Sequence, residues 1–515
     1  MADFLVRWAE FGGGEYGLLD PSRAEKDQWS GTNMIEYQSG LLGVRPGLKS
    51  LVIDWQGEPG THPVVPGPLG FDVQNENLLI PLQLTNDDWA TFKIDFNTGV
   101  ATPFPAYTSP PTEFIRYAEG AQTLYGLING ELWKHEPGGM TQITLPAGIK
   151  LSGLVRWNYW LIGVDQDTPY RIWHSTVTVN GPEFDNWGIN NYLDVGSNLP
   201  ILTLRPIFNT LYCGKQDGWW GVSGILGQQA SVRFRAIGNG PATDRGCTVT
   251  TDNRLLYWPT ESVPAWFNGD RVYLDKDYQL SGYDTEFICD TVIATPTGKR
   301  LLMIGELSGQ PDGEEKSGML LWDKAWSVHE FDQPISGAVP QDVRAGTKMP
   351  SGVTFLIRRP VVITDPVEIG SFQLDAIRPS HFDDPFAAPI DFEGTELVTG
   401  QVDLPAHWDG QGRMVLVKNL IVQFRKWPSG IDGTLNRLEA TVVPLGRYEG
   451  GSAQTNSLIW TEPSDRANGE GTDDSVRMSF GDQGWSAGFQ VKFNKLRGVA
   501  IREVIAVCEV RMARI

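Results

Sequence analysis

Short apolar runs that alternate with polar residues fill the first three quarters of the chain, and turn residues separate them. The turns come in pairs about ten residues apart, and the pairs recur about every 45 residues. Asn129-Gly130, Asp217-Gly218 and Asp252-Asn253 are turns of the hairpin kind, because their residues tolerate positive φ. The pattern predicts antiparallel strands at LLIPLQL, QTLYGLI, YWLIGV, LYCGK, RLLYWP, KRLLMIGEL and VTFLIRR.

Four short antiparallel strands per unit at this period are typical of the blades of a β-propeller. About seven units, with a range of six to eight, fit between Leu69 and Asp365. Because a propeller ring must be closed, the strand-like segment Leu48–Trp55 is expected to complete the last blade. The sequence therefore predicts an all-β fold with a β-propeller at residues 48–385. A large sandwich or a stack of β-domains with similar spacing is the alternative.

The rhythm changes near Glu393, where seven alternating runs follow with Gly-rich turns between them, and these predict an independent β-sandwich at residues 393–515. The stretch His381–Phe392 has two prolines and no periodicity, so it is expected to be a linker. Residues 1–47 are expected to form an N-terminal arm with one short helix at Pro21–Trp29, for which Asp20 is a candidate N-cap.

Composition supports folded domains, and the sequence shows neither a membrane-spanning segment nor a signal peptide. The 515 residues exceed one ordinary core, and 41% of them are hydrophobic. No apolar run approaches the roughly 20 residues that span a bilayer, so no membrane-spanning segment is expected. The start MADFLVRWAEFGGGEYG lacks the regions of a signal peptide. The cysteines lie far apart without a CxxC pair, so buried free thiols are expected at Cys213, Cys247, Cys289 and Cys508.

The negative charge is concentrated in the predicted propeller. Up to Pro389 the chain has 46 acidic and 28 basic residues, whereas beyond Pro389 it has 16 and 14. A surface this negative repels the phosphate backbone, which makes direct nucleic-acid binding through a basic groove improbable. The alternative is that the charge serves only solubility.

Candidate chemistry is sparse in this sequence. The six histidines (His62, His135, His174, His329, His381 and His407) are scattered without metal-ligand spacing. Gly298-Lys299 lacks the preceding Gly-rich run of a P-loop, and the segment around Ser223 lacks the spacing of a nucleophile elbow. Carboxylates suited to a glycosidase pair exist, namely Asp54, Asp95 and Asp217, but nothing in the sequence places two of them face to face. No catalytic, metal or cofactor site is expected.

Two aromatic groups are candidates for ligand stacking or for packing between blades. They are Trp157 to Trp160 and the pair Trp219-Trp220. Adjacent residues on a strand point to opposite faces, so one of Trp219 and Trp220 should lie in the core and the other outward. The outward ring would stack on a sugar or fill a subunit interface, unless it packs between neighbouring blades.

Four segments, in order, point to one family. Gly12–Gly47 begins Gly-rich and ends in GVRPG, Leu154–Gly224 ends in LYCGKQDGWWGVSG, Asp244–Tyr273 ends a blade on FNG, and Gly498–Val504 reads GVAIREV. Together they resemble the β-propeller tail proteins of tailed bacteriophages, the nozzle or tail-hub subunits of short-tailed phages. The likeness spans most of the chain, although each motif is loose and the order of the pieces carries the weight.

The resemblance implies a structural virion protein of the phage tail, assembled in the host cytoplasm. It implies a tail nozzle or hub ring that forms part of the DNA-ejection conduit, a homo-oligomer for which six copies are expected. Its partners would be portal, adaptor and other tail proteins, while DNA passes without specific binding. A siphophage minor tail or tail-tip protein that binds a receptor or glycan is the alternative, and a propeller glycan hydrolase is a further one.

Two sets of charged residues are candidates for contacts in such a ring. Acidic propeller loops should face the lumen, with Asp87, Asp88, Glu306, Asp312, Glu314 and Glu315 as candidates. The nearly neutral C-terminal domain is expected to contact neighbouring subunits through basic residues on its last strands: Lys492, Lys495, Arg497, Arg502, Arg511 and Arg514. The alternative for both sets is a solvated outer surface.

Overall fold

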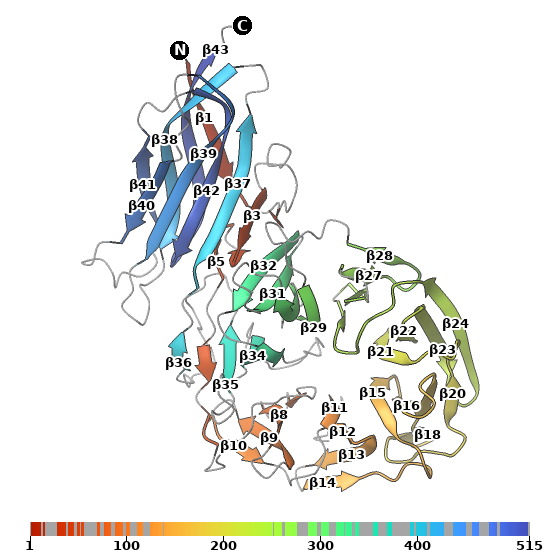
Figure 1. The fold of residues 1–515 in the computed structure, drawn as a ribbon. Helices are drawn as coiled ribbons and strands as arrows, with labels where there is room; N and C mark the ends of the chain where they lie inside the picture. Colours follow the sequence, from red (N-terminus) through yellow and green to blue (C-terminus); the bar gives the residue numbers. More distant parts are fainter. Residues whose placement is uncertain are drawn as a thin grey trace.

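The structure, a computed structural model, is built from β-strands throughout its described residues (Figure 1). It describes residues 124–275 with gaps only at 137–138, 251 and 260–262. Elsewhere it describes the strands and short connections between them, and the longest segments outside it are 16–27, 56–69, 276–286, 339–353 and 373–391. Within this described part, no helix is long and apolar enough to cross a membrane. The all-β prediction is confirmed.

Five four-stranded antiparallel sheets follow one another in the described chain. The first comprises β7 (Gly70–Asp72), β8 (Asn77–Gln83), β9 (Trp89–Asp95) and β10 (Ala101–Pro103). The second comprises β11 (Pro111–Arg116), β12 (Leu124–Ile128), β13 (Glu131–Glu136) and β14 (Gly139–Gln142). The third comprises β15 (Leu151–Trp157), β16 (Trp160–Asp165), β17 (Arg171–His174) and β20 (Tyr192–Asp194). The fourth comprises β21 (Ile201–Ile207), β22 (Thr210–Lys215), β23 (Gly218–Ile225) and β24 (Gln229–Ile237). The fifth comprises β25 (Cys247–Val249), β26 (Leu255–Tyr257), β27 (Ala265–Phe267) and β28 (Val272–Leu274).

Two further groups of four strands continue the series. β29 (Phe287–Ala294), β30 (Leu301–Leu307), β31 (Lys316–Asp323) and β32 (Ala325–Phe331) pair in that order. β33 (Ile335–Ala338), β34 (Thr354–Arg358) and β35 (Glu368–Phe372) pair next, and β6 (Lys49–Leu51) completes this group. β6 pairs with β35 through Ser50 and Gly370, and it also pairs with β36 (Phe392–Thr395). The prediction that Leu48–Trp55 supplies a strand to the last group is confirmed for Lys49–Leu51.

The first strands of these groups form the inner part of a ring. β7, β11, β15, β21, β25, β29 and β33 contact one another in that succession. Figure 1 shows the groups arranged around a common centre, with β24 on the outer rim. Four-stranded antiparallel sheets arranged radially in this way are a β-propeller. Large apolar side chains fill the space between neighbouring sheets; for example, Trp219 on β23 stacks on Phe267 of the fifth sheet with ring centroids 5.0 Å apart.

The C-terminal strands form a second body of β-structure. They are β37 (Gly400–Trp408), β38 (Arg413–Lys426), β39 (Arg437–Glu449), β40 (Asn456–Thr461), β41 (Asp473–Ser479), β42 (Trp485–Arg497) and β43 (Val499–Met512). Alternation along these strands sends one set of side chains into a shared core that includes Phe424, Phe489 and Val504. This region is drawn in blue above the ring in Figure 1.

The first residues of the chain belong to this C-terminal core, which corrects the prediction of an N-terminal arm at 1–47. β1 (Ala2–Ala9) pairs antiparallel with β43 along its whole length. Val6 and Trp8 are buried in the core, whereas Leu5 before them is 54% exposed and Arg7 between them is exposed, so side chains along β1 alternate between core and solvent. Apolar side chains at every second position need a sheet face to cover them, and a free arm offers none.

The predicted helix at Pro21–Trp29 is wrong at its end, because Trp29 lies in β3 (Gln28–Thr32), while residues 21–27 lie outside the described part. β3 pairs with both β32 of the propeller and β37 of the C-terminal strands. β4 (Met34–Glu36) and β5 (Leu42–Val44) form a hairpin beside β43. One sheet therefore runs from the propeller into the C-terminal strands. Of the predicted linker His381–Phe392, the structure describes Phe392 alone.

Buried cations hold the junction between β32 and the N-terminal strands. Arg45 donates to the carbonyl of Glu330 at 2.6 Å, and its guanidinium lies 4.6 Å from the centre of the Phe331 ring. Arg300 pairs with Asp323 at 2.9 Å and donates to the carbonyl of Glu36. Both arginines are at least 95% buried, so their charges are satisfied within the protein.

His329 lies in this junction and should make the protein acid-sensitive. Burial, together with Arg45 and Arg300, lowers the pKa of His329 well below its usual value, so the ring is neutral in the folded state. The unfolded chain takes up the proton near pH 6.5, and stability should therefore fall below that pH by up to about 1.4 kcal/mol per pH unit. Thermal midpoints of wild type and His329→Gln between about pH 5 and 7 check this, and the variant should give the flatter curve. Equal slopes would contradict it.

Candidate functional site

Two neighbouring hairpins place their tips side by side on one face of the ring. β15 and β16 are joined by Asn158 and Tyr159, and β21 and β22 are joined by Phe208 and Asn209. The first turn residue has a positive φ of 51° in both hairpins, at Asn158 and at Phe208. Asparagine tolerates this conformation, whereas a bulky aromatic residue there is strained.

A cavity of about 280 Å³ lies between the two tips. Its lining consists of Arg156, Trp157 and Asn158 from the third sheet and Pro206 and Phe208 from the fourth. The Phe208 ring is 76% exposed and Tyr159, next to Asn158 in the turn, is 62% exposed. The site therefore combines exposed aromatic rings with a guanidinium and an amide, which are groups that orient a polar ligand.

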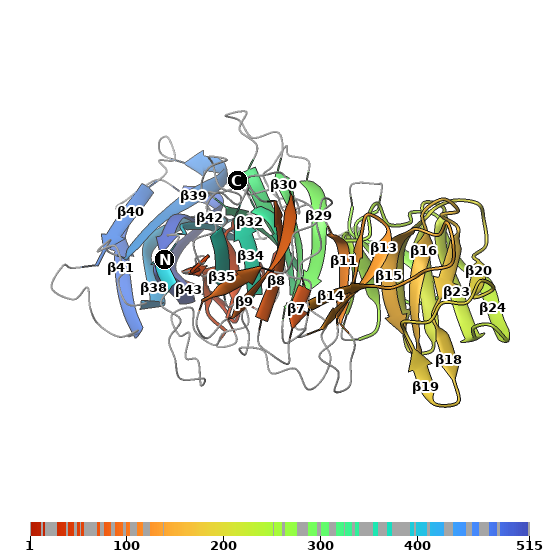
Figure 2. The ribbon, with the colours of Figure 1, turned by 90° about the horizontal axis from the view of Figure 1, so that it is seen from below.

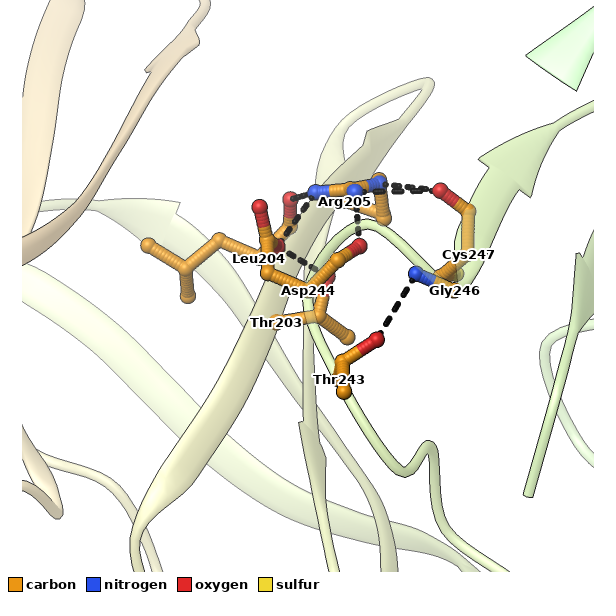
Figure 3. A network of polar contacts seen from close by, with 7 residues as sticks. All are labelled: Thr203, Leu204, Arg205, Thr243, Asp244, Gly246 and Cys247. Atoms are coloured by element: carbon orange, nitrogen blue, oxygen red, sulfur yellow. Dashed lines mark hydrogen bonds and ion pairs between the residues drawn. The ribbon is translucent and has the colours of Figure 1, made fainter. Parts of the chain in front are cut away.

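A polar network fixes the strand that carries the second tip (Figure 3). Arg205 on β21 donates from Nη1 to Asp244 Oδ1 at 2.8 Å and from Nη2 to the carbonyl of Cys247 at 3.0 Å. Thr203 Oγ1 also donates to Asp244 Oδ1, at 2.6 Å. These bonds join β21 to the start of the fifth sheet, so the backbone before Pro206 and Phe208 is held from the neighbouring sheet.

An inserted hairpin projects from the third sheet. β18 (Thr176–Thr178) and β19 (Gly181–Glu183) lie between the third and fourth strands of the third sheet, and Figure 2 shows them extending beyond the other strands. Val179 is fully exposed. The following segment is tied to the second sheet, where Asp185 accepts from Tyr125 Oη and Lys134 Nζ, each at 2.9 Å. The insertion therefore has a fixed base and an apolar tip.

The outer rim is the second surface with unusual exposure. β20, β24 and β28 are the fourth strands of three consecutive sheets, and each shows an apolar side chain to solvent. Tyr192, Phe234 and Tyr273 are 40–47% exposed and Ile237 is 83% exposed. β24 is nine residues long and, among the described strands, pairs on one side only, with β23. Unprotected edges of this length favour association with another chain.

The predicted aromatic candidates serve mainly for packing. Trp219 is buried and Trp220 is half-buried on the opposite face, where it packs on Phe234 with centroids 4.7 Å apart. The two rings pack against different clusters on opposite faces of β23, as expected, but neither is the outward ring of the prediction, because Trp220 packs against the core that contains Leu211 and Cys213. Trp157 and Trp160 are also buried, so Tyr159 is the exposed aromatic of that group.

The structure does not bring the predicted charged residues together as one site. Glu306 is exposed on β30 and Asp88 is half-buried, while Asp87, Asp312, Glu314 and Glu315 lie outside the described residues. Lys492, Lys495 and Arg497 lie on β42, and Arg502 and Arg511 lie on β43, whereas Arg514 is outside the described part. Lys492 pairs with Asp403 of the adjacent strand at 2.8 Å, which partly satisfies this cluster within the subunit.

The candidate carboxylates and thiols are likewise accounted for. Asp54 and Asp95 both lie beside Val100 at the first sheet, whereas Asp217 lies in the turn after β22 of the fourth sheet. Among the described residues, no group of three His, Cys, Asp or Glu residues is placed to hold a metal. The prediction of buried free thiols is confirmed for Cys213, Cys247, Cys289 and Cys508. Burial raises the pKa of Cys213, Cys247 and Cys508 to about 12.

Sequence reasoning missed the cavity and Phe208. A signal was present, because IFNT and WNYW occupy equivalent hairpins and Phe208 stands where Asn158 stands in the other. An aromatic residue at the turn position that asparagine favours marks a site that local propensity does not explain.

Comparison with known proteins gives weak likenesses. No family model matches the sequence, and no curated protein matches it. The structure is similar to BBS1N from its complex with ARL6DN (TM-score 0.40, 12% identity, 68% of this chain and 100% of that chain). It is also similar to KlHsv2 with an altered loop (0.36, 9%, 68% and 95%) and to a putative 6-phosphogluconolactonase from Bacteroides fragilis (0.36, 13%, 56% and 98%). At this level the likenesses carry no argument about function.

Proposed function

We propose that this chain is a structural subunit of a phage tail, part of a nozzle or hub ring around the path of the ejected DNA. In this proposal the strand groups from β7 to β35 are seven blades, β6 closes the seventh, and the C-terminal strands are a β-sandwich. The sequence resemblance supplies the family, and the surface of the propeller supports the role in assembly.

The exposed rim of β20, β24 and β28 is the observation that carries the proposal. A nine-residue edge strand with Phe234 and Ile237 exposed is a liability in an isolated molecule, and a neighbouring subunit would remove it. The rim strand β24 also carries Arg233 and Arg235 on a chain of net charge −20. Arg235 already pairs with Asp270 at 3.5 Å within the chain, whereas the exposed Arg233 would attract the acidic surface of a second copy and so orient side-by-side contacts.

The acidity of the chain agrees with a conduit, because a negatively charged lining repels the DNA backbone and prevents the DNA from binding to it.

The location of the protein is tested by mass spectrometry of tails that have been separated from the capsids of the phage that encodes it. Absence of this protein from the purified tails would reject the proposal. Cryo-electron microscopy of the same particles would show whether the copies form a ring on the DNA axis.

The rim contact gives a separate prediction. Ile237→Glu should shift the purified protein from the ring to the monomer, because it buries a charge in the apolar contact. Its effect on the folded monomer should stay within about 0.5 kcal/mol, since Ile237 is 83% exposed. Native mass spectrometry measures the change, and Ile459→Glu, at a 56% exposed position on β40, is the matched control. Loss of the ring in the control alone would show that the contact between subunits lies on the C-terminal domain and not on the rim.

A further inference from the structure

We propose that the cavity between the tips of the β15–β16 and β21–β22 hairpins binds a neutral pyranose sugar, with the Phe208 ring as the stacking surface. The five lining residues include none from the rim strands β20, β24 and β28, so sugar binding and ring assembly are tested on different residues. Failure of the sugar site would leave the tail proposal untouched, and the reverse also holds.

Phe208 adopts a backbone conformation that is rare for an aromatic residue. Of the seven non-glycine residues with positive φ in the described chain, five are asparagines and Phe208 is the one aromatic residue. Its ring is 76% exposed, so it gains little from packing that would offset the strained backbone. The equivalent hairpin meets the same geometry with Asn158. The strain is therefore unexplained by the fold and is consistent with a ring held ready for a ligand.

The lining of the cavity matches the chemistry of a sugar. The weakly polar C–H face of a pyranose packs on an aromatic ring, and Phe208 presents one at the mouth of the cavity. Hydroxyl groups need both donors and acceptors; the Arg156 guanidinium supplies donors and the Asn158 amide supplies both. Arg156 is half-buried and its guanidinium faces the Phe184 ring at 5.9 Å, which limits its movement.

The charges of the protein disfavour an anionic ligand at long range and a cationic ligand beside Arg156, so a neutral ligand fits best. At net charge −20 the chain repels anions at long range, and the lining offers Arg156 as its one cation. Tyr159 in the adjacent turn, 62% exposed, would extend the stacking surface to a second sugar unit. A neutral oligosaccharide should therefore bind more tightly than its monosaccharide.

Titration of the full-length protein with a panel of neutral sugars tests the site, using D-glucose, D-galactose, D-mannose, N-acetyl-D-glucosamine and their β-linked dimers. Ligand-detected NMR and calorimetry should show saturable binding of at least one sugar with Kd of about 1 mM. No saturable binding of any of them up to about 50 mM would overturn the proposal.

Phe208→Asn separates binding from folding. It should raise the thermal midpoint by about 2–4 °C, because asparagine adopts positive φ more readily, while it weakens sugar binding at least about 10-fold. Arg156→Gln should weaken binding to a similar extent. Ile189→Asn, at a 73% exposed position outside the lining, is the control and should bind as wild type does. Undiminished binding in Phe208→Asn would overturn the assignment of the site.

Discussion

Trp8→Ala is expected to destabilise the C-terminal strands by about 3–5 kcal/mol, although Trp8 lies at the other end of the sequence. Its indole is 1% exposed, meets the Phe489 ring edge-on at 5.9 Å between centroids, and donates from Nε1 to the carbonyl of Pro405 at 3.3 Å. Truncation removes the packing and leaves a cavity between β1, β37 and β42. The carbonyl of Pro405 also loses its partner.

Hydrogen exchange measured strand by strand checks this prediction, because a protein of several domains need not unfold in one step. Amides of β37, β42 and β43 should lose protection, while those of β15–β17 and β21–β24 should keep it. Leu5→Ala on the same strand is the control; at 54% exposure it should change stability by less than about 1 kcal/mol. Unchanged exchange in β42 of the Trp8 variant would show that β1 is dispensable for this core.

The same placement changes what a truncation can reveal. Removing residues 393–515 would take away β43, the partner of β1, and would uncover Trp8 and Trp29. An insoluble product would then report a broken core and not a failure of assembly. The rim variant Ile237→Glu avoids that difficulty, because it changes an exposed side chain and leaves both cores intact.

Alternation and turn residues predicted the propeller strands because those signals are local. Asn129, Asn158 and Asn253 adopt the positive φ that their turns require, and each lies between strands that pair antiparallel. The pairing of β1 with β43 and of β3 with β32 joins residues hundreds of positions apart. Period-2 alternation states that one face of β1 is buried, but it does not state which strand covers it.

The site was harder to predict than the fold for a related reason. WNYW drew attention as an aromatic cluster, but Trp157 and Trp160 became core and Tyr159 remained exposed. Phe208 carries no motif, and its importance depends on a backbone angle and on the neighbouring hairpin, neither of which a single sequence states. The charged candidates were chosen by local density, which does not determine that Lys492 on β42 pairs with Asp403 on the adjacent strand β37.

Lys426→Met should be the most damaging change of a single charge in the C-terminal strands. Lys426 Nζ lies 3.2 Å from Glu462 Oε1, and the two side chains are 7% and 1% exposed. Glu462 also accepts from Asn436 Nδ2 at 2.9 Å. Removing the ammonium leaves a buried carboxylate with one neutral donor, which costs about 3–5 kcal/mol. The loss should appear as a lower unfolding midpoint of the C-terminal transition in calorimetry, assigned to its strands by hydrogen exchange.

The double variant Lys426→Met/Glu462→Gln decides whether the cost comes from the unpaired charge or from lost packing. Glutamine keeps an oxygen for Asn436 Nδ2 and buries no charge, so most of the stability should return, to within about 1–2 kcal/mol of wild type. Methionine matches the length of the lysine stem, so the packing of residue 426 beside β43 is largely kept in both variants. Recovery would show that the pair is held together by the need to neutralise Glu462. A double variant as unstable as Lys426→Met alone would instead assign the loss to the shape of the buried lysine side chain.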